Sequence, residues 1–372
     1  MAESNVYFTT FRTTFTENLL QKLRRLVKTA GIDTIDFTDK FTAIKMHFGE
    51  PGNLAFLRPN FAKVIADIVK ENGGKPFLTD CNTLYVGGRK NAPDHLDAAT
   101  MNGFNPLTTG CQIIIADGLK GTDDIEVPVK NGTYCKTAKI GRAVMDADVF
   151  ISLNHFKGHE NAGFGGALKN IGMGCGSRAG KMEMHYAGKP KVNPALCIGC
   201  GACTRSCAHT GVTLTDVDGK KKAVVDHSKC VGCGRCIGVC PKDAMQPCDS
   251  DSNEKLNCKI AEYASAVISD RPNFHISLVM DLSPNCDCHA ENDAPFAPDV
   301  GMFASFDPVA LDQACADAVN AMPKLAGSCL EEMPCDTHDH FINVHPDTDW
   351  HSQVEHGEKI GLGTRNYNLI KI

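Results

Sequence analysis

CIGCGACTRSCA at residues 197–208 and CVGCGRCIGVCP at residues 230–241 are two copies of one cysteine spacing. Each copy reads C-x2-C-x2-C-x3-C, and every cysteine of the second copy follows its counterpart at the same offset. Glycines separate the cysteines, which allows the backbone to turn sharply between them. Two copies of loop-like content predict one duplicated module and argue against a longer array of helical repeats.

This spacing is typical of a bacterial ferredoxin with two 4Fe-4S clusters. Three thiolates of one run bind three irons of a cubane, and the fourth cysteine of that run binds the other cluster. The first predicted cluster therefore has the ligands Cys197, Cys200, Cys203 and Cys240, and the second has Cys230, Cys233, Cys236 and Cys207. Zinc ribbons and disulfides are the alternatives, but a zinc site has no use for the third cysteine of each run. Ala208 stands where the first run would carry proline, which affects the turn and no ligand.

Composition limits the remaining function classes. The chain has 372 residues, a net charge of −6 and one tryptophan, so nucleic acid is not an expected partner. No apolar run is long enough for a membrane helix, and the first residues lack the pattern of a signal peptide. Nineteen cysteines in such a chain indicate reduced thiols and metal binding, and we expect a cytoplasmic protein of an anaerobe. Cys81, Cys111 and Cys315 lie in apolar segments and are expected in the core.

Short apolar runs alternate with helical stretches on both sides of the cysteine runs. This rhythm predicts an α/β domain with a largely parallel sheet, into which an α+β ferredoxin-like module is inserted. The predicted domains are residues 1–189 and 249–372 for the two parts of the α/β domain, and 190–248 for the module. The clearest expected strands lie within 41–48, 75–80, 111–119, 147–159 and 275–282, and the clearest expected helices within 17–30, 57–74, 254–269 and from 307 onward. Thr14 and Glu17 form a possible capping box for the first helix.

The glycine-rich segment 155–178 follows a predicted strand and carries several cations and histidines. Glycines of this kind let backbone lie against a ligand, and Lys157, Lys169 and Arg178 are suited to an anionic group. A mobile surface loop with solvated charges is the alternative interpretation. The residues predicted to bind a cofactor are Lys157, His159, Gly165, Gly166, Lys169 and Asn170. Spacing identifies no catalytic residue.

A second candidate loop, DLSPNCDCH at residues 281–289, follows the strand predicted at 275–282. Because sites in open α/β sheets gather at the carboxyl ends of strands, this loop and the glycine-rich segment are placed to face each other. Cys286 and Cys288 are candidate ligands of a third metal or cluster, possible partners being Asp287, His289, Cys175 and His185. The alternative is a pair of thiols that cap a turn. Weaker candidates are His47 and a tail group formed by Cys335, His338, His340 and His345.

HFKGHENAGFGGALKNIGMGC at 155–175, GKMEMH at 180–185, the cysteine runs, DLSPNCDCH at 281–289 and SFDPVALDQA at 305–314 resemble the domain of unknown function numbered 362. The resemblance spans about residues 40–325 and implies an iron-sulfur protein that contains a ferredoxin module. It implies an architecture far more than a reaction. The expected function is single-electron transfer between two clusters and a site on the α/β domain, with a small-molecule substrate or a redox partner protein. The alternative is a non-enzymatic electron-transfer subunit that docks to a partner oxidoreductase.

Overall fold

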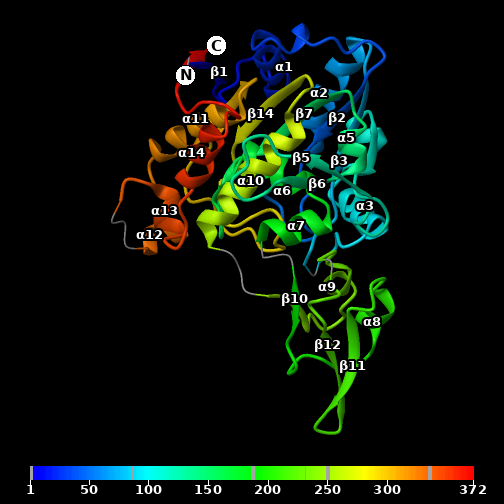
Figure 1. Cartoon of the computed structure of the whole chain (residues 1–372). Coiled ribbons are helices and arrows are strands. Elements are labelled where there is room, and N and C mark those ends of the chain that lie inside the picture. Colours follow the sequence, from blue (N-terminus) through cyan, green and yellow to red (C-terminus); the bar gives the residue numbers. More distant parts are fainter. Residues whose placement is uncertain (1–2, 86, 186–188, 231, 249–251, 334–336) are drawn as a thin grey trace.

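A computed structural model describes residues 3–85, 87–185, 189–230, 232–248, 252–333 and 337–372. Its largest part is a mixed α/β domain in which helices cover both faces of one eight-stranded sheet (Figure 1). The strand order is β16-β1-β15-β14-β7-β2-β3-β4. In chain order these strands are β1 (Ser4–Thr9), β2 (Phe41–Lys45), β3 (Lys75–Asp80), β4 (Gln112–Ile115), β7 (Val149–His155), β14 (Asn273–Val279), β15 (Gly301–Ser305) and β16 (Tyr367–Lys371).

The sheet is largely parallel, as the sequence predicts. Strands β14, β7, β2, β3 and β4 pair in parallel, whereas β15 is antiparallel to both of its neighbours. Since β1 and β16 are parallel to each other, β15 is the only described strand of this sheet that runs in the opposite direction. The clearest strands and helices expected from the sequence are all present within or close to their predicted limits.

Side chains of the central strands alternate between two apolar cores, one on each face of the sheet. Along β7, Phe150 joins one core, while Val149, Ile151 and Leu153 join the other. Every residue of β7 is buried, which explains why its sequence reads as a nearly continuous apolar run. The first core is completed by α6 (Ala167–Cys175), α10 (Asn253–Ile268), α11 (Pro308–Asn320) and α14 (His351–Lys359). The second is completed by α1 (Leu19–Thr29), α2 (Pro59–Glu71) and α3 (Ala92–Met101).

The remaining elements of the α/β domain are short. They are a 3-10 turn (Ile32–Thr34), α4 (Pro106–Thr109), β5 (Asp124–Pro128), β6 (Thr137–Gly141), α5 (Arg142–Met145), β8 (Lys157–His159), β9 (Gly163–Gly165), α7 (Arg178–His185), α12 (Cys329–Glu332) and α13 (His340–Val344).

Two local predictions about helix starts have different outcomes. Asp307 caps α11 as expected, because its side chain accepts hydrogen bonds from the backbone N–H groups of Val309 and Ala310. The capping box of α1 is formed by Asn18 and Gln21 instead of Thr14 and Glu17. Thr14 and Glu17 form an isolated bridge just before the helix.

The glycine-rich segment is more ordered than the sequence predicts. Residues 157–165 form a small antiparallel hairpin of β8 and β9, and residues 167–175 form helix α6. Its glycines do allow close approach. A Cβ atom at Gly158 would overlap the backbone of Pro284, and one at Gly166 would overlap the carboxylate of Asp312. The segment is therefore packed and largely buried, and the alternative of a surface loop with solvated charges is wrong.

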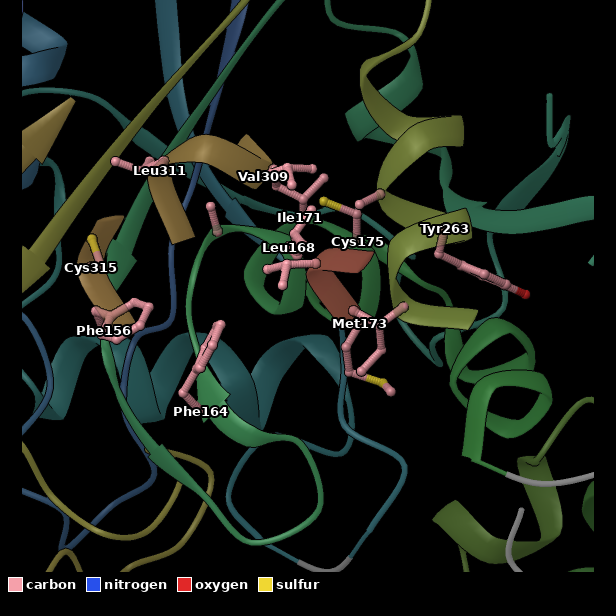
Figure 2. Close-up of a cluster of buried hydrophobic side chains, with 14 of the residues drawn as sticks. Phe156, Phe164, Leu168, Ile171, Met173, Cys175, Tyr263, Val309, Leu311 and Cys315 are labelled. Atoms are coloured by element: carbon pink, nitrogen blue, oxygen red, sulfur yellow. The ribbon is translucent and has the colours of Figure 1, made fainter. Parts of the chain in front are cut away.

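Gly172 fixes the distance between α6 and α10. Leu168, Ile171 and Met173 of α6 and Tyr263 of α10 belong to the same buried apolar cluster (Figure 2). A Cβ atom at Gly172 would overlap the carbonyl oxygen of Ile260 in α10. We expect Gly172→Ala to lower the free energy of unfolding by about 1–3 kcal/mol, since both backbones must separate. The change is measured as a shift of the urea unfolding midpoint.

Gly357→Ala is the matched control, because Gly357 is also a buried helical glycine, in α14. The nearest atom to its added Cβ is a methyl group of Val309, at 3.0 Å, and a methyl group can move aside more easily than backbone. Equal midpoint shifts for the two variants would contradict the assigned role of Gly172.

Residues 190–248, called here the cysteine module, extend from one end of the α/β domain (Figure 1). The module contains β10 (Pro190–Val192), α8 (Ala202–Ser206), β11 (Val212–Val217), β12 (Lys220–Val225), α9 (Arg235–Gly238) and β13 (Met245–Pro247). β10 pairs with β13 and β11 pairs with β12, both antiparallel. Helices α8 and α9 each begin after a glycine with positive φ, Gly201 and Gly234. The exact domain limits at 189/190 and 248/249 stay predictions.

The described helices were also compared with the length of a membrane span. None of them combines the length and the apolar character that a crossing helix needs.

Candidate functional site

A cavity of about 380 Å³ lies at the carboxyl ends of the parallel strands. Strands β3 and β4 lie to one side of β2, and β7 and β14 lie to the other, so the chain reverses its direction of progress between β2 and β7. Ligands of open α/β sheets bind at such a switch point. The cavity walls come from the ends of β2, β3 and β7 and from the loop after β14, represented by Lys45, Asp80, His155 and Asp287.

Most residues that the sequence predicts for cofactor binding line this cavity. They are Lys157, His159, Gly166, Lys169 and Asn170. Gly165 lies behind Lys157, where a Cβ atom would overlap the Lys157 ammonium.

The two candidate loops meet in space. His155 Nδ1 lies 2.9 Å from both carboxylate oxygens of Asp287. Lys169 Nζ donates to Cys286 Sγ at 3.1 Å. Together these contacts join the segment after β7 to the loop after β14 across one side of the cavity.

The opposite side of the cavity carries a buried network centred on Asp80. Lys45 Nζ lies 3.0 Å from Asp80 Oδ1 and donates to Asn170 Oδ1 at 2.7 Å. Arg89 Nη1 lies 3.8 Å from the other Asp80 oxygen, and Arg89 Nε donates to Glu50 at 2.7 Å. Burial alone raises the pKa of Asp80, but the charges of Lys45 and its other cationic neighbours outweigh burial and lower it. The positive charges of Lys45 and Arg89 thus offset the negative charges of Asp80 and Glu50 on this side of the cavity.

Lys157 differs from these paired cations. Its residue is only 5% exposed, and its side chain lines the cavity. Among the described residues no hydrogen-bond acceptor or ion-pair partner is found for its ammonium group. A buried ammonium without a hydrogen-bonded partner is costly to maintain, and part of this cost is offset by the attraction to Cys286 and Asp287, whose pKa values the charge of Lys157 lowers.

Cys286 and Cys288 have opposite acid-base properties. Two main effects hold the pKa of the Cys286 thiol well below its ordinary value. The larger is a hydrogen bond with Cys288, and the next is the positive charge of Lys169. The same hydrogen bond and burial raise the pKa of the Cys288 thiol. Lys169 thus favours the ionised form of Cys286, whereas Cys288 lines the cavity together with His289.

Several other predicted site residues have different positions. Both ring nitrogens of His155 are occupied, one by Asp287 and one by the carbonyl oxygen of Met280 at 2.7 Å. Arg178 donates to the carbonyl oxygens of Lys120 and Lys90 and does not line the cavity. Cys175 is part of the apolar core, whereas His47 and His185 do line the cavity. Cys81, Cys111 and Cys315 are buried, as expected.

The tail group does not form a shared site in the described part of the chain. His340 Nε2 lies 2.7 Å from the carbonyl oxygen of Met322, and His345 Nε2 lies 2.6 Å from that of Pro284. Cys335 lies outside the described residues.

Two small cavities in the cysteine module gather the eight cysteines of the repeated runs. Cys197, Cys200, Cys203 and Cys240 line one of them. Cys207, Cys230, Cys233 and Cys236 line the other. Each cavity thus receives three cysteines from one run and the last cysteine of the other run.

The surroundings of these thiols fit a 4Fe-4S cluster. The backbone N–H groups of Ala223 and Gly211 point at Cys197 Sγ and Cys207 Sγ, at 3.4 and 3.3 Å. Such N–H···S contacts tune the potential of bound clusters. Glycines 199, 201, 232 and 234 all have positive φ, which keeps side chains away from the tight turns between the cysteines.

The cysteine module contacts the α/β domain next to the large cavity. Leu84 and Met182 of the α/β domain share an apolar cluster with Cys236 and Ile237 of the module. A Cβ atom at Gly234 would lie 3.2 Å from Leu84 and 3.0 Å from Met182. Leu84 also lines the large cavity, so it lies between the cysteine module and that cavity.

Sequence reasoning missed the Asp80 network and Lys181, which also line the cavity. Asp80 ends a predicted strand, so the same strand-end argument that selected Asp281–His289 would have found it. Arg89 and Glu50 carried no such signal, because each lies in an irregular segment away from a strand end.

Three known proteins show distant similarity to this chain. A thylakoid-associated protein of Synechocystis sp. is 28% identical over 131 residues, which are 34% of this chain and 35% of that protein. The lactate racemase apoprotein from Thermoanaerobacterium thermosaccharolyticum aligns with 11% identity and a TM-score of 0.34, over 75% of this chain and 51% of that one. A protein from Thermotoga maritima aligns with 12% identity and a TM-score of 0.39, over 81% and 58%. The chain therefore spans about a third of the curated relative and little more than half of each solved chain.

The family comparison covers far more of the chain. A family model described as "Domain of unknown function (DUF362)" matches residues 42–317, which include the central strands, both candidate loops and the cysteine module, and the chain belongs to this family.

Proposed function

We propose that this protein transfers electrons through two 4Fe-4S clusters in the cysteine module to an anionic ligand in the large cavity. The clusters would be held by the two sets of four cysteines that line the small cavities. When bound, each cluster supplies one electron at a time. The cavity residues Lys157 and Lys169 would bind and orient the anion.

The observation that carries this proposal is the shared contact at Leu84. This residue packs against the cysteine module and also lines the cavity. The thiols of Cys233 and Cys236 belong to the nearer small cavity, beside α9, and α9 lies between α8 and the α/β domain in Figure 1. Since electron transfer slows steeply with distance, this cluster is the one suited to exchange electrons with the cavity.

The electron count is consistent with a two-electron reaction. Two reduced clusters together hold two electrons, and the ligand would accept these with two protons from water. The clusters would be reduced again by a low-potential one-electron carrier protein. This reaction class needs no hydride donor.

Iron and acid-labile sulfide per chain, measured on protein purified without oxygen, test the first half of the proposal. We expect about eight irons and an electron paramagnetic resonance spectrum, after dithionite reduction, of two interacting 4Fe-4S centres. Stoichiometric zinc in place of iron, or fewer than about four irons after reconstitution, would contradict it.

Reoxidation of the reduced protein tests the second half. We expect saturable reoxidation by small anionic oxidants such as 2-oxo acids, which take up two electrons and two protons to become 2-hydroxy acids. Reoxidation by carrier proteins alone, with no response to any small anion, would instead support the electron-transfer subunit that docks to a partner oxidoreductase.

A further inference from the structure

Three different metal-binding groups lie together at the edge of the large cavity. They are the carboxylate of Glu160, the thiol of Cys288 and the imidazole of His289, and one donor atom of each lies within 4.8 Å of the other two. Glu160 follows β8, whereas Cys288 and His289 belong to the loop after β14. The group therefore exists only because the two candidate loops meet.

The carboxylate of Glu160 supplies a second, independent observation. Its Oε1 accepts a hydrogen bond from His289 Nε2 at 2.9 Å. Its Oε2 is buried and has no hydrogen-bond partner among the described residues. His159 Nδ1 lies 3.8 Å from this oxygen, too far for a hydrogen bond. The Glu160 side chain as a whole is 31% exposed, but Oε2 is a buried atom, and a cation bound there would supply the contact that this oxygen lacks.

Two neighbouring residues, Glu291 and Cys286, lie close to the group. Glu291 Oε1 lies 3.6 Å from His289 Nδ1, the nitrogen that is turned away from Glu160. This distance is too long for a hydrogen bond, so Glu291 acts on the imidazole only through its negative charge. Cys286 Sγ accepts a hydrogen bond from Lys169 Nζ at 3.1 Å, and Cys286 does not line the cavity.

An ion pair between Glu160 and His289 is the simpler explanation of the 2.9 Å contact. It does not account for the buried Oε2 atom or for the Cys288 thiol beside the pair. The pair Asp349–His351 provides a comparison. There a histidine lies 2.8 Å from a carboxylate on the exposed surface, and within the described part of the chain no third metal-binding side chain joins that pair.

We propose that Glu160, Cys288 and His289 bind one borderline divalent cation of the zinc or ferrous class. One sulfur, one nitrogen and one oxygen donor suit such an ion better than magnesium or calcium, which prefer oxygen ligands. Three protein ligands leave a coordination position for a ligand, as in catalytic zinc sites. All three residues line the large cavity, so that position is available to the anion that Lys157 would also bind. The site does not depend on the two clusters.

Zinc binding to the full chain tests this site. The protein is purified without oxygen, treated with a chelator and equilibrated with Zn²⁺, and both zinc and iron are counted. We expect one zinc per wild-type chain. Glu160→Gln, Cys288→Ser and His289→Gln should each weaken zinc binding by about 100-fold or more, which exceeds the usual effect of losing an outer partner.

His351→Gln is the matched control, because it removes an exposed histidine from a similar pair with a carboxylate. We expect this variant to bind zinc as the wild type does. Wild-type affinity in all three ligand variants, or equal loss in the control, would overturn the proposal. The iron content per chain separates the two hypotheses. Bound zinc in a chain without iron would contradict only the proposal of two 4Fe-4S clusters. About eight irons without bound zinc would contradict only the proposal of a metal site at Glu160, Cys288 and His289.

Discussion

Cys203→Ser is expected to remove one of two clusters, so that iron falls from about eight to about four per chain. A serine hydroxyl is a much weaker iron ligand than a thiolate, because soft thiolates are the preferred donors of iron-sulfur clusters. Cys203 lines the cavity that also contains Cys240, far along the sequence. The α/β domain should stay folded, since no residue of its two main cores belongs to the cysteine module.

Cys240→Ser makes the test sharper. Because Cys240 lines the same small cavity as Cys203, both variants should lose the same cluster and leave the same residual spectrum. Cluster binding within single runs would instead make the two variants lose different clusters. Cys248→Ser is the control, since Cys248 lies next to the module's last strand and lines neither of the two small cavities. Full iron content in Cys203→Ser would refute the ligand assignment.

Lys157→Met is expected to change stability and ligand binding in opposite directions. The substitution removes a buried ammonium that has no hydrogen-bonded partner among the described residues and keeps most of the side-chain volume. We expect the free energy of unfolding to rise, by on the order of 1 kcal/mol. Affinity for inorganic phosphate, a simple anionic probe, should fall by about 30-fold or more, because a buried charge pair is lost. Calorimetric titration and urea unfolding measure the two effects.

Lys130→Met serves as the control for that experiment. Lys130 forms an exposed ion pair with Asp270, so its loss should hardly change either measurement. A Lys157→Met protein that is less stable than the wild type would show that Lys157 has a structural role. Unchanged phosphate affinity would show that Lys157 does not bind the anion.

Much of the α/β domain could be predicted because the apolar pattern of each segment agrees with its burial in the fold. Strand β7 is buried on both faces and reads as an apolar run, and α11 carries its cap, Asp307, just before Pro308. Strands β1, β15 and β16 were not predicted. Their place at one edge of the sheet, and the reversed direction of β15, depend on pairing between segments far apart in sequence. Periodicity within a segment contains no information about such pairing.

The candidate site was predictable only in part, for a similar reason. The strand-end rule selected the segments that supply Lys157 and Cys288, and the structure brings them to one cavity. It gave no way to pair Cys286 with Lys169, or Cys288 with Glu160. The glycine pattern predicted close approach of the backbone to a ligand, and it gave no sign that residues 167–175 form a helix. Gly172 shows the other use of glycine, which is to let two helices pack closely.

The pairing of β10 with β13 has a topological consequence. Pro190 lies opposite Pro247 in this two-stranded ladder, so the chain enters and leaves the cysteine module at neighbouring points. The module is therefore an insertion whose first and last residues are adjacent in space. A short turn in place of the module could join the two parts of the α/β domain. Because no strand of the eight-stranded sheet lies within the module, we expect that removing it in this way would leave the sheet intact.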